Sequence, residues 1–409
     1  MTMTLRRADA ITSVSLDDHV AAALSLVQQT EVCSVPLAEA TGLVLADDLT
    51  APGFLPAFDN AAMDGYAVHH ADLAGTGGVP VHLPLADEIA ACSTLPPPLR
   101  RGTAAPIMTG APLPQGATAV VPIEHTLDTT AGVELPVVVP AGQHVRRRGQ
   151  EHLPGDVLLG RGRLLRPVDL AVLAAAGIST APVHRRPRVA VLGTGTELVA
   201  PGERRVDGAV HDANTTLLAT LVRTYGADVT TLPPTADDRP DVLRHLVERA
   251  AATHDLVVTA GGVSAGTHEV VRLALDRRGS HFHPVAISPG APQGLGTVAG
   301  TPLLALPGNP SAALVSCAMF VRPVVLALAG RGAAESGWTS VTLAQSLDRR
   351  PDRTRILPVL LEERGGRTLA LECGSAHRLE SFAAGEAIVR LEPGDHPVRA
   401  GSRVPALRL

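Results

Sequence analysis

Residues 188–199 read RVAVLGTGTELV, an apolar run of strand length that ends in a glycine-rich loop. The same pattern returns at 255–266 (DLVVTAGGVSAG) and at 301–311 (TPLLALPGNPS), and amphipathic stretches separate the three segments. Continuous apolar strands that alternate with amphipathic helices are typical of a parallel sheet covered by helices on both faces. The sequence therefore predicts an α/β domain over residues 187–331.

The segments outside this domain have a different residue pattern. Residues 15–30 predict a helix capped by Ser15, and residues 166–178 predict a second helix that Gly177 ends. Between them lies a stretch rich in Pro and Gly with short β-branched runs, which predicts a β-domain. The polar stretch 184–187 is interpreted as a linker. The predicted units are a discontinuous helical N-terminal domain (1–50 and 145–186), an inserted β-domain (51–144), the α/β domain (187–331) and a C-terminal β-barrel or sandwich (332–409).

The composition excludes several classes of protein. The net charge is −5 and no basic run exceeds the arginine triplet at 146–148, so we expect no nucleic-acid binding. The four cysteines lie far apart without metal-ligand spacing, which fits a reducing, cytoplasmic location. The N-terminus lacks the apolar core of a signal peptide, and no stretch of about 18 apolar residues predicts a membrane span. All 35 basic residues are Arg, with no Lys in the chain.

The glycine-rich loops are the first candidates for chemistry. Ligands of open parallel sheets bind beyond the carboxyl ends of the strands, where loops 193–197, 261–266 and 307–311 should meet. Their backbone N–H groups and the helix N-termini behind them favour a phosphate-bearing ligand. The alternative is that the glycines merely end strands. The loop GTGTEL lacks the third glycine of a dinucleotide motif and the P-loop pattern is absent, so a dehydrogenase or a P-loop ATPase is disfavoured.

Acidic residues form a second layer near the same sheet edge. They are Glu197, Asp212, Asp237, Asp238 and Glu269. Some of them could hold Mg²⁺, which would offset the charge of phosphates and oxyanions. Each could instead be a helix cap or a solvated loop acid, and Asp212 in particular could simply cap its helix.

Six ordered segments carry a resemblance to a known family. They are DNAAMDGYAV (59–68), IMTGAPLPQGATAVVPIE (107–124), VRRRGQEHLPGDVLL (145–159), VAVLGTGTELV (189–199), DLVVTAGGVSAG (255–266) and LPGNPSAALV (306–315). Taken alone, the first two would be structural turns. In this order the six resemble molybdopterin molybdenumtransferases of the MoeA family, over nearly the whole chain. The resemblance implies an elongated four-domain homodimer that places molybdate on the dithiolene of adenylylated molybdopterin, releasing AMP with the help of Mg²⁺.

The resemblance also implies site residues. Asp59 and Thr109 would reach from the β-domain of one subunit to the sheet edge of its partner. Glu151, Glu197 and Glu269 complete the catalytic carboxylates, and Glu197 and Glu269 are the metal ligands. The residues expected to bind substrate are Asp64, Gly195, Asp212, Asn214, Asp237, Gly261, Gly262, Ser264, Gly266, Pro307, Gly308, Asn309, Pro310, Ser311, Ser288, Arg350, Arg355 and Ser375.

Two departures from the family pattern concern charge. Thr196 replaces an acid of the family's STGDEL loop, and the lysine-bearing KPGKP segment reads SPGAP at 288–292. A further lysine, four residues earlier, is Pro284 here. Because none of these positions became Arg, the subsite for the molybdate dianion should be weaker unless Arg350, Arg355 or His283 compensates.

Three functions stay open at this point. The first is the molybdenumtransferase reaction, carried out by positioning and electrostatics without a protein nucleophile. The second is molybdopterin adenylylation, which the same α/β domain serves in a related family. The third is a molybdopterin-binding scaffold or low-activity paralogue, which the missing lysines motivate.

Overall fold

The apolar segments build a six-stranded sheet in the order β17-β14-β18-β22-β21-β19 in the computed structural model. The model describes residues 13–74, 79–92, 94–135, 138–233, 239–264, 266, 269–332 and 337–409. β17 (Asp228–Thr231), β14 (Arg188–Gly193), β18 (Leu256–Ala260) and β22 (Thr301–Leu306) are parallel, as predicted. β21 (Pro292–Val298) and β19 (Ser280–Pro284) extend the sheet as antiparallel strands, and the sequence analysis had not assigned them.

Helices cover both faces of this sheet, because neighbouring side chains along a strand point to opposite faces. Val191 packs towards α3 (Ala213–Thr224) and the helix made of α6 (Pro310–Ser316), the π-helical turn η4 (Cys317–Val321) and α7 (Arg322–Leu328). Leu192 packs towards α4 (Pro240–Ala251) and α5 (Val270–Leu275). Both faces are therefore buried around β14, β18 and β22, which explains why these three strands are mostly apolar, whereas the edge strand β17 (DVTT) is largely exposed.

The stretch Pro310–Leu328 is a core helix of this domain. Its 19 residues contain an 18-residue window with a mean hydropathy of 1.9, which is long and apolar enough to cross a membrane, but 83% of that window is buried inside the fold. This corrects the expectation that the chain holds no apolar stretch of that length.

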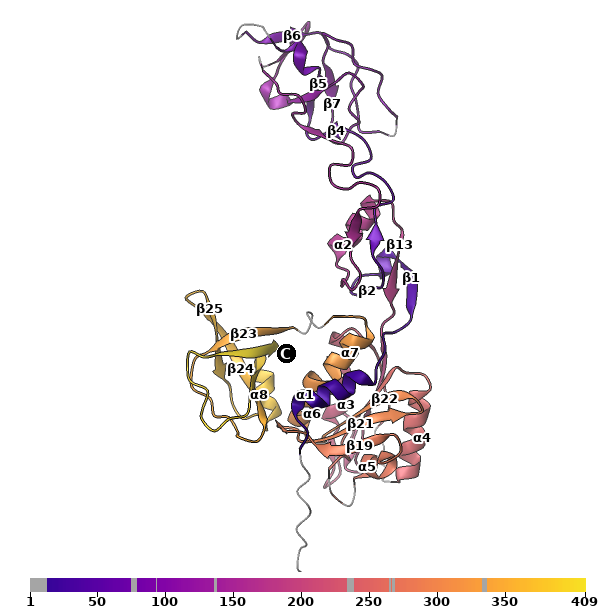
Figure 1. The fold of residues 1–409 in the computed structure, drawn as a ribbon, viewed down its shortest axis with the longest axis vertical. Coiled ribbons are helices and arrows are strands. Elements are labelled where there is room, and N and C mark those ends of the chain that lie inside the picture. Colours follow the sequence, from indigo (N-terminus) through magenta and orange to yellow (C-terminus); the bar gives the residue numbers. More distant parts are fainter. Residues whose placement is uncertain are drawn as a thin grey trace, which may run out of the picture.

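Helix α1 (Leu16–Ser25) is attached to the α/β domain. Its N-cap Ser15 accepts a hydrogen bond from the N–H of Asp18, as predicted, but the helix ends at Ser25 instead of continuing to residue 30. It contacts α7 and η4 (Figure 1), where Ala23 joins the core of the sheet. The sequence analysis placed this helix with the first domain.

The first domain contains more strand than helix. β1 (Val32–Pro36), β13 (Thr180–His184) and β2 (Val44–Leu45) form one sheet, and β12 (Val157–Leu159) pairs with β3 (Leu49–Thr50). The predicted second helix is present as α2 (Pro167–Ala175), with Pro167 at its first turn and Gly177 beyond its end in the left-handed region (φ 82°). The domain expected to be helical thus combines α2 with five short strands.

The stretch 184–187 is an anchored junction and not the loose linker that its polarity suggested. His184 is buried and pairs through Nδ1 with the carbonyl of Thr30. Arg185 donates two hydrogen bonds to the carboxylate of Asp255, at 2.6 and 2.8 Å. Asp255 also accepts the N–H of Arg188 at 2.7 Å, so the junction is tied to the first strand of the α/β domain.

The inserted β-domain lies at the far end of the molecule (Figure 1). Its strands are β4 (Asn60–Ala61), β5 (Gly65–Val68), β6 (Val81–Leu83), β7 (Ala105–Ile107), β8 (Ala119–Pro122), β9 (Leu127–Thr129), β10 (Gly132–Leu135) and β11 (Val145–Arg146). They form the small sheets β7-β5-β8, β6-β10-β9 and β11-β4.

The C-terminal residues form a closed barrel, one of the two predicted alternatives. β23 (Trp338–Leu343), β24 (Thr354–Arg364), β25 (Arg367–Glu372), β26 (Ala387–Leu391) and β27 (Arg403–Arg408) close through pairing of β24 with β26. Helix α8 (Leu379–Ala384) contacts β24. The short strand β20 (Ile287–Ser288) leaves the α/β domain and pairs with β24 in parallel, so it joins the two units.

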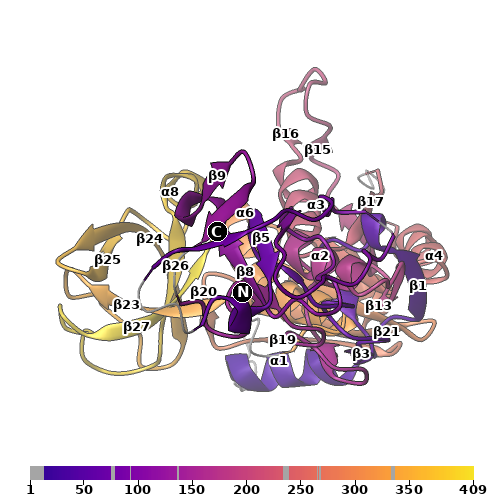
Figure 2. The same cartoon turned by 90° about the horizontal axis from the view of Figure 1, so that it is seen from above.

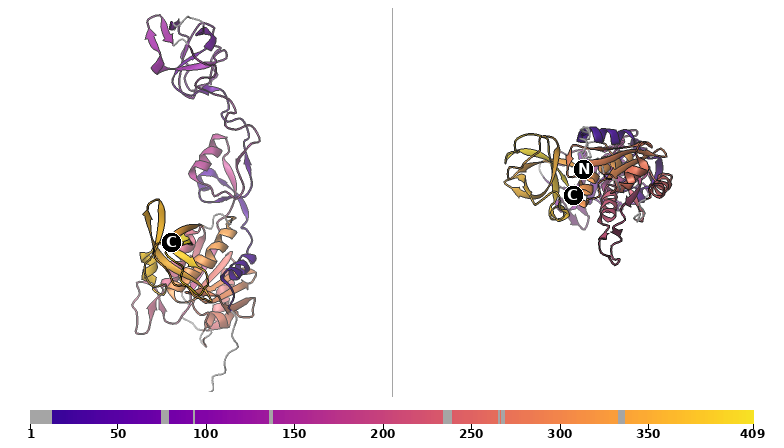
Figure 3. Two further views of the ribbon diagram at one scale, coloured as in Figure 1. Left: turned by 60° about the vertical axis from the view of Figure 1, so that its left-hand side comes forward. Right: turned by 90° about the horizontal axis from the view of Figure 1, so that it is seen from below.

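The molecule is elongated. The barrel and the α/β domain lie side by side at one end, the first domain follows, and the β-domain occupies the other end (Figures 1 and 3). Seen along the long axis, a ribbon formed by β15 (Leu198–Val199) and β16 (Val210–His211) projects from the α/β domain (Figure 2).

Candidate active site

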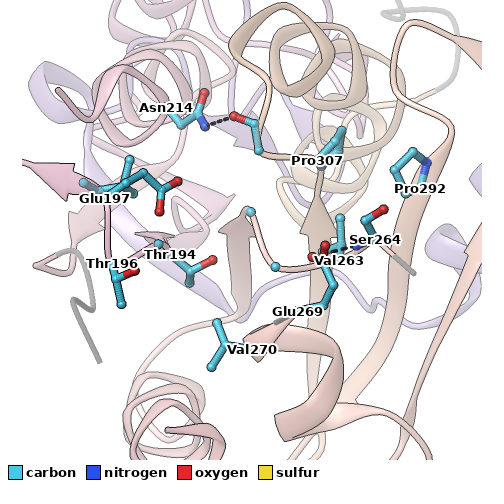
Figure 4. Close-up of a pocket in the computed structure, with 15 residues that line it drawn as sticks. Thr194, Thr196, Glu197, Asn214, Val263, Ser264, Glu269, Val270, Pro292 and Pro307 are labelled. Atoms are coloured by element: carbon cyan, nitrogen blue, oxygen red, sulfur yellow. Dashed lines mark hydrogen bonds between the residues drawn. The ribbon is translucent and has the colours of Figure 1, made fainter. Parts of the chain in front are cut away.

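A cavity of about 510 Å³ lies at the carboxyl ends of β14, β18 and β22. The three glycine-rich loops meet there, as the sequence predicted, and Figure 4 shows their residues around the cavity. The lining residues are Thr194, Gly195, Thr196, Glu197, Leu198, Asn214, Gly261, Gly262, Val263, Ser264, Glu269, Val270, Pro292, Pro307 and Gly308.

Unused backbone donors make this cavity a cradle for an anion. Within the described part of the chain, the N–H groups of Gly195, Thr196, Gly262, Val263 and Gly308 donate to no acceptor. They belong to all three loops, and free N–H groups beside helix N-termini bind phosphate oxygens well. The geometry therefore suits a phosphate-bearing ligand.

The loops pack against one another through glycine. Gly261 has φ +100°, and a Cβ on it would lie 2.5 Å from the carbonyl oxygen of Thr194. A Cβ on Gly308 would lie 3.3 Å from the Cα of Gly261. The first and third loops thus both approach Gly261 more closely than a larger residue would comfortably permit.

Asn214 ties the third loop to helix α3. Its Nδ2 donates a 2.7 Å hydrogen bond to the carbonyl of Gly308 (Figure 4). Its Oδ1 is buried and meets no donor among the described residues. The Asn214 side chain therefore fixes the third loop at the edge of the cavity, while its Oδ1 atom stays without a donor among the described residues.

Two carboxylates lie on opposite sides of the cavity (Figure 4). Glu269 accepts the N–H of Ser264 at 2.9 Å and so fixes the second loop. The carboxylate of Glu197 folds back over Gly195 and has no hydrogen-bond or ion-pair partner within the described ranges. Among the described lining residues there are two acids and no basic side chain. No group of three or more potential metal ligands is found in the described part of the chain.

Several predicted ligand residues are helix caps instead. Asp212 is the N-cap of α3 and accepts the N–H of Thr215, so its capping alternative is the one observed. Asn309 caps α6, accepting the N–H groups of Ser311 and Ala312 and the hydroxyl of Ser311. Pro310 is the first residue of α6. Of the predicted residues in the loop 307–311, Pro307 and Gly308 line the cavity.

Other predicted residues of this region stand apart from the cavity or outside the description. Gly266 follows the second loop, and a Cβ on it would lie 3.1 Å from Oε1 of Glu269, but Gly266 is not among the lining residues. Asp237 and Asp238 lie outside the described residues.

The predicted residues of the upper half do not meet the cavity of the same chain (Figure 1). Asp59 accepts the N–H of Arg148 at 2.7 Å and pairs with Arg147 at 2.8 Å; these contacts lower its pKa. Asp64 accepts the N–H and the hydroxyl of Thr109 at 2.6 and 2.7 Å, and both contacts lower the pKa of Asp64.

Glu151 is also away from the cavity. Its N–H donates to the carbonyl of Leu55 at 2.9 Å, and its side chain is exposed. Within one protomer, the β-domain acids and the glycine loops therefore form two separate groups.

The residues expected around a molybdate subsite lie beside the junction of the α/β domain and the barrel. Ser288 is in register with Arg355, whose guanidinium donates to the carbonyl of Asp348. Arg350 and Ser375 are exposed on the barrel. None of these four residues lines the cavity, although Pro292 of the same segment does.

His283 does not supply the missing positive charge. Its Nε2 lies 3.1 Å from Nδ1 of the buried His19, and its pKa is lowered by burial and by His281. A lowered pKa keeps the ring neutral near pH 7. Of the three groups that could compensate for the missing lysines, His283 is therefore the least suited.

Thr194 and Val263 belong to the predicted glycine loops but were not singled out, although both line the cavity. The sequence analysis did not place Leu198 or Val270 at the site, and each directly follows one of the two predicted acids, Glu197 and Glu269. Pro292 lies in the segment 288–292, which the sequence analysis linked to the molybdate subsite and not to the glycine loops.

The comparisons with known proteins agree with this architecture. Residues 14–177 match the model of the MoeA N-terminal region (domain I and II), residues 190–327 that of a probable molybdopterin binding domain, and residues 340–409 that of the MoeA C-terminal region (domain IV). The fold and its glycine-edged cavity thus define a protein built around a domain of the molybdopterin-binding class.

The similarity to known proteins covers nearly the whole length of this chain and of its relatives. Molybdopterin molybdenumtransferase 2 of Mycobacterium tuberculosis is 37% identical over 398 residues, covering 95% of this chain and 98% of the relative. Molybdopterin molybdenumtransferase 1 of the same organism is 32% identical and covers 90% and 93%. A crystal structure of a MoeA protein from Pyrococcus horikoshii has a TM-score of 0.80 at 28% identity and covers 97% of this chain and 99% of its own. The chain belongs to the MoeA family, as its sequence motifs indicated.

Proposed function

We propose that this chain is a Mg²⁺-dependent molybdopterin molybdenumtransferase, which inserts molybdate into adenylylated molybdopterin and releases AMP. The observation that carries the proposal is the cavity at the carboxyl ends of β14, β18 and β22, where three loops present unused N–H groups. The match to the MoeA family over nearly the whole length supports the choice of substrate and reaction.

The backbone of the loops would position the phosphates. Fixed N–H dipoles need no reorganisation when charge shifts, so they stabilise a leaving phosphate without a protein nucleophile. No cysteine is among the lining residues described, which agrees with a reaction that has no covalent intermediate on the protein. Positioning and electrostatics would therefore carry the catalysis.

Glu197 and Glu269 are the residues that would hold Mg²⁺. Proteins usually bind this ion with one or two carboxylates and complete its shell with substrate phosphates and water. Two acids beside an anion cradle fit that donor set, and Glu197 has no competing partner in the described part of the chain. When bound, the ion would offset the charge on the phosphates as AMP leaves.

The proposal extends to the assembly. In a homodimer, Asp59, Asp64, Thr109 and Glu151 of one subunit would approach the cavity of the other. None of the four lines the cavity of its own chain, and the strands β4, β5 and β7 of the inserted β-domain lie at the far end of the molecule (Figure 1). We also propose a cytoplasmic location. The four-unit division of the chain is kept with two changes. Helix α1 goes with the α/β unit, against which it packs, and β11 goes with the inserted β-domain, where it pairs with β4.

The direct test is AMP release from adenylylated molybdopterin in the presence of molybdate and Mg²⁺. Glu197→Gln should lower the rate at least about tenfold, because a neutral amide holds the ion poorly, while the melting temperature stays unchanged. Glu203→Gln, an exposed change in the adjoining ribbon, is the matched control and should keep full activity. No AMP release by the unmodified protein would refute the proposal, and full activity in excess EDTA would refute the metal's part in it.

One observation favours a second candidate, a scaffold or low-activity paralogue that binds molybdopterin. No basic side chain lines the cavity in the described ranges, and the segment 288–292 carries none. The scaffold predicts tight binding of molybdopterin without molybdate-dependent AMP release. Pyrophosphate release from ATP and molybdopterin in the same assay would instead identify an adenylyltransferase.

A further inference from the structure

One buried side chain, that of Gln293, anchors the segment 288–292. This glutamine is 1% exposed and is the second residue of β21. Its Nε2 group donates one hydrogen bond to the carbonyl of Gly290 at 2.6 Å and another to the hydroxyl oxygen of Ser316 at 2.7 Å. Both hydrogens of the amide therefore tie the segment to helix α6, which ends at Ser316.

The same side chain leaves its other polar atom unsatisfied. Oε1 of Gln293 is buried and meets no donor in the described part of the chain. A buried acceptor without a donor destabilises the folded state, and an apolar side chain of the same size would avoid that cost. Rotating the amide would not help, because Oε1 would then face the carbonyl oxygen of Gly290. Stability alone therefore does not explain a glutamine at this position, whereas the fixing of Gly290 does.

Gly290 packs directly against helix α6. It has φ +103°, and a Cβ on it would lie 2.9 Å from Oγ of Ser316 and 3.3 Å from the carbonyl oxygen of Ala312. The N–H groups of Gly290 and Ala291 donate to no acceptor among the described residues, and both residues are only half-buried. The turn thus holds two neighbouring N–H groups unused, an arrangement that binds anions.

Helix α6 also carries the third glycine loop. The helix begins directly after its cap Asn309, and Pro307 and Gly308 line the glycine-loop cavity. Pro292, the residue before the glutamine, lines the same cavity (Figure 4). The glutamine amide therefore fixes the position of one cavity wall relative to another.

We propose that Gln293 is a positioning residue for the oxyanion subsite of this protein. The inference rests on the proposed function, because the molybdate subsite is expected at the segment 288–292. By holding the carbonyl of Gly290 against α6, the glutamine keeps the N–H groups of Gly290 and Ala291 available to the oxygens of the dianion. Backbone donors would thereby replace the side-chain charge that this segment lacks.

A purely structural role is the alternative. Gln293 could serve only to join β21 to α6, and its loss would then lower the stability of the fold without a specific effect on molybdate. The two roles differ in one measurable quantity, which is the change in the KM for molybdate relative to the change in kcat.

Steady-state AMP release at varied molybdate concentration tests the proposal. Gln293→Met nearly keeps the side-chain volume but removes both donors, so the KM for molybdate should rise about tenfold, the effect of a displaced binding group. The kcat and the KM for adenylylated molybdopterin should stay within about twofold. Ser280→Ala is the matched control, because it removes a buried hydroxyl without a partner in the described ranges on β19, the strand next to β21. It should leave all three constants unchanged.

Ser316→Ala removes the anchor on α6 and serves as the second variant if Gln293→Met shifts the melting temperature. It should also raise the KM for molybdate, and the double variant should lose no more than Gln293→Met alone, because both changes break one linkage. Losses that add up in the double variant, an unchanged KM for molybdate in Gln293→Met, or an equal rise in Ser280→Ala would overturn the proposal.

Isothermal titration with molybdate separates this inference from the proposed reaction. If the unmodified protein releases no AMP, the reaction fails, but a Kd for molybdate about tenfold weaker in Gln293→Met than in Ser280→Ala still supports the positioning role. Equal Kd values in the two variants, or no saturable binding of molybdate to the unmodified protein, would rule that role out.

Discussion

Gly261 shows how much the site depends on single residues. It combines a positive φ with backbone contact, whereas Gly202 has φ +90° and open space around its ideal Cβ. Gly202→Ala should therefore cost about 1–2 kcal/mol from backbone strain alone. Gly261→Ala adds overlap with the carbonyl of Thr194 and should cost about 2–4 kcal/mol. Urea unfolding of both variants measures the difference, and equal losses would show that the loops can move apart.

At this scale the sequence predicted part of the site. The glycines and the acids Glu197 and Glu269 were found because strand ends in a parallel sheet converge. Asn309 and Ser311 were assigned to the ligand but serve helix α6. A polar residue before a helix has the same appearance in a sequence whether it caps the helix or binds a ligand, so coordinates are needed to separate the two roles.

The docking of α1 should depend on pH. His19 is buried against Phe320 and His283, and burial, with a contribution from His283, lowers the pKa of His19 to about 3. Between pH 6.5 and 3 the unfolded state binds more protons than the folded state, so stability is full above about pH 6.5 and falls on acidification. At pH 4.5 the loss should reach about 2–3 kcal/mol.

Trp338 provides a reporter for this effect. It is the chain's single tryptophan, and it lines a groove together with Leu16 and Val20 of α1. Urea unfolding followed by its fluorescence at pH 7.5 and 4.5 measures the loss. His19→Gln should flatten the pH dependence, while His245→Gln, at an exposed site on α4, should leave it intact. An unchanged pH dependence in His19→Gln would contradict the assignment.

The sequence predicted the helices and strands better than it predicted which elements they pack against. The parallel strands and α2 to α4 follow from apolar runs and amphipathic periods that are local in the sequence. The pattern of α1 indicated a helix with one apolar face but not the surface that this face covers. β21 was missed because its sequence PQGLGTV contains proline and glycine and lacks clear alternation.

At the scale of the whole molecule, the contact between Arg185 and Asp255 fixes the junction between the first domain and the α/β domain. Burial raises the pKa of Asp255, but the hydrogen bonds from Arg185 and from the N–H of Arg188 outweigh it and lower the pKa overall. The contribution is therefore present above the ordinary carboxyl pKa and is lost as the pH falls below it. Arg185→Ala and Asp255→Ala should show a coupling of about 1–3 kcal/mol in a double-mutant cycle by urea unfolding at pH 7.

Arg186→Ala is the control for this cycle. Arg186 donates a 3.4 Å hydrogen bond to the carbonyl of Thr41, not to Asp255. It should therefore show little coupling to Asp255→Ala. A coupling as large as that of Arg185 would mean that the effect reflects net charge and not the hydrogen bonds between Arg185 and Asp255. Sequence alone suggested a linker here, because the residues Arg185, Arg186 and Pro187 are typical of a polar loop. Their anchoring depends on Asp255, which is distant in the sequence.

The antiparallel pairing of β1 and β13 has a consequence for chain continuity. The outgoing and returning polypeptides are aligned from Val32 opposite His184 to Pro36 opposite Thr180, so two strands bridge the halves. A protease nick at an exposed residue of the insertion, such as Val138, would leave the two fragments associated. Two separately expressed fragments divided at that residue should accordingly reassemble, so this protein is suited to split-gene complementation.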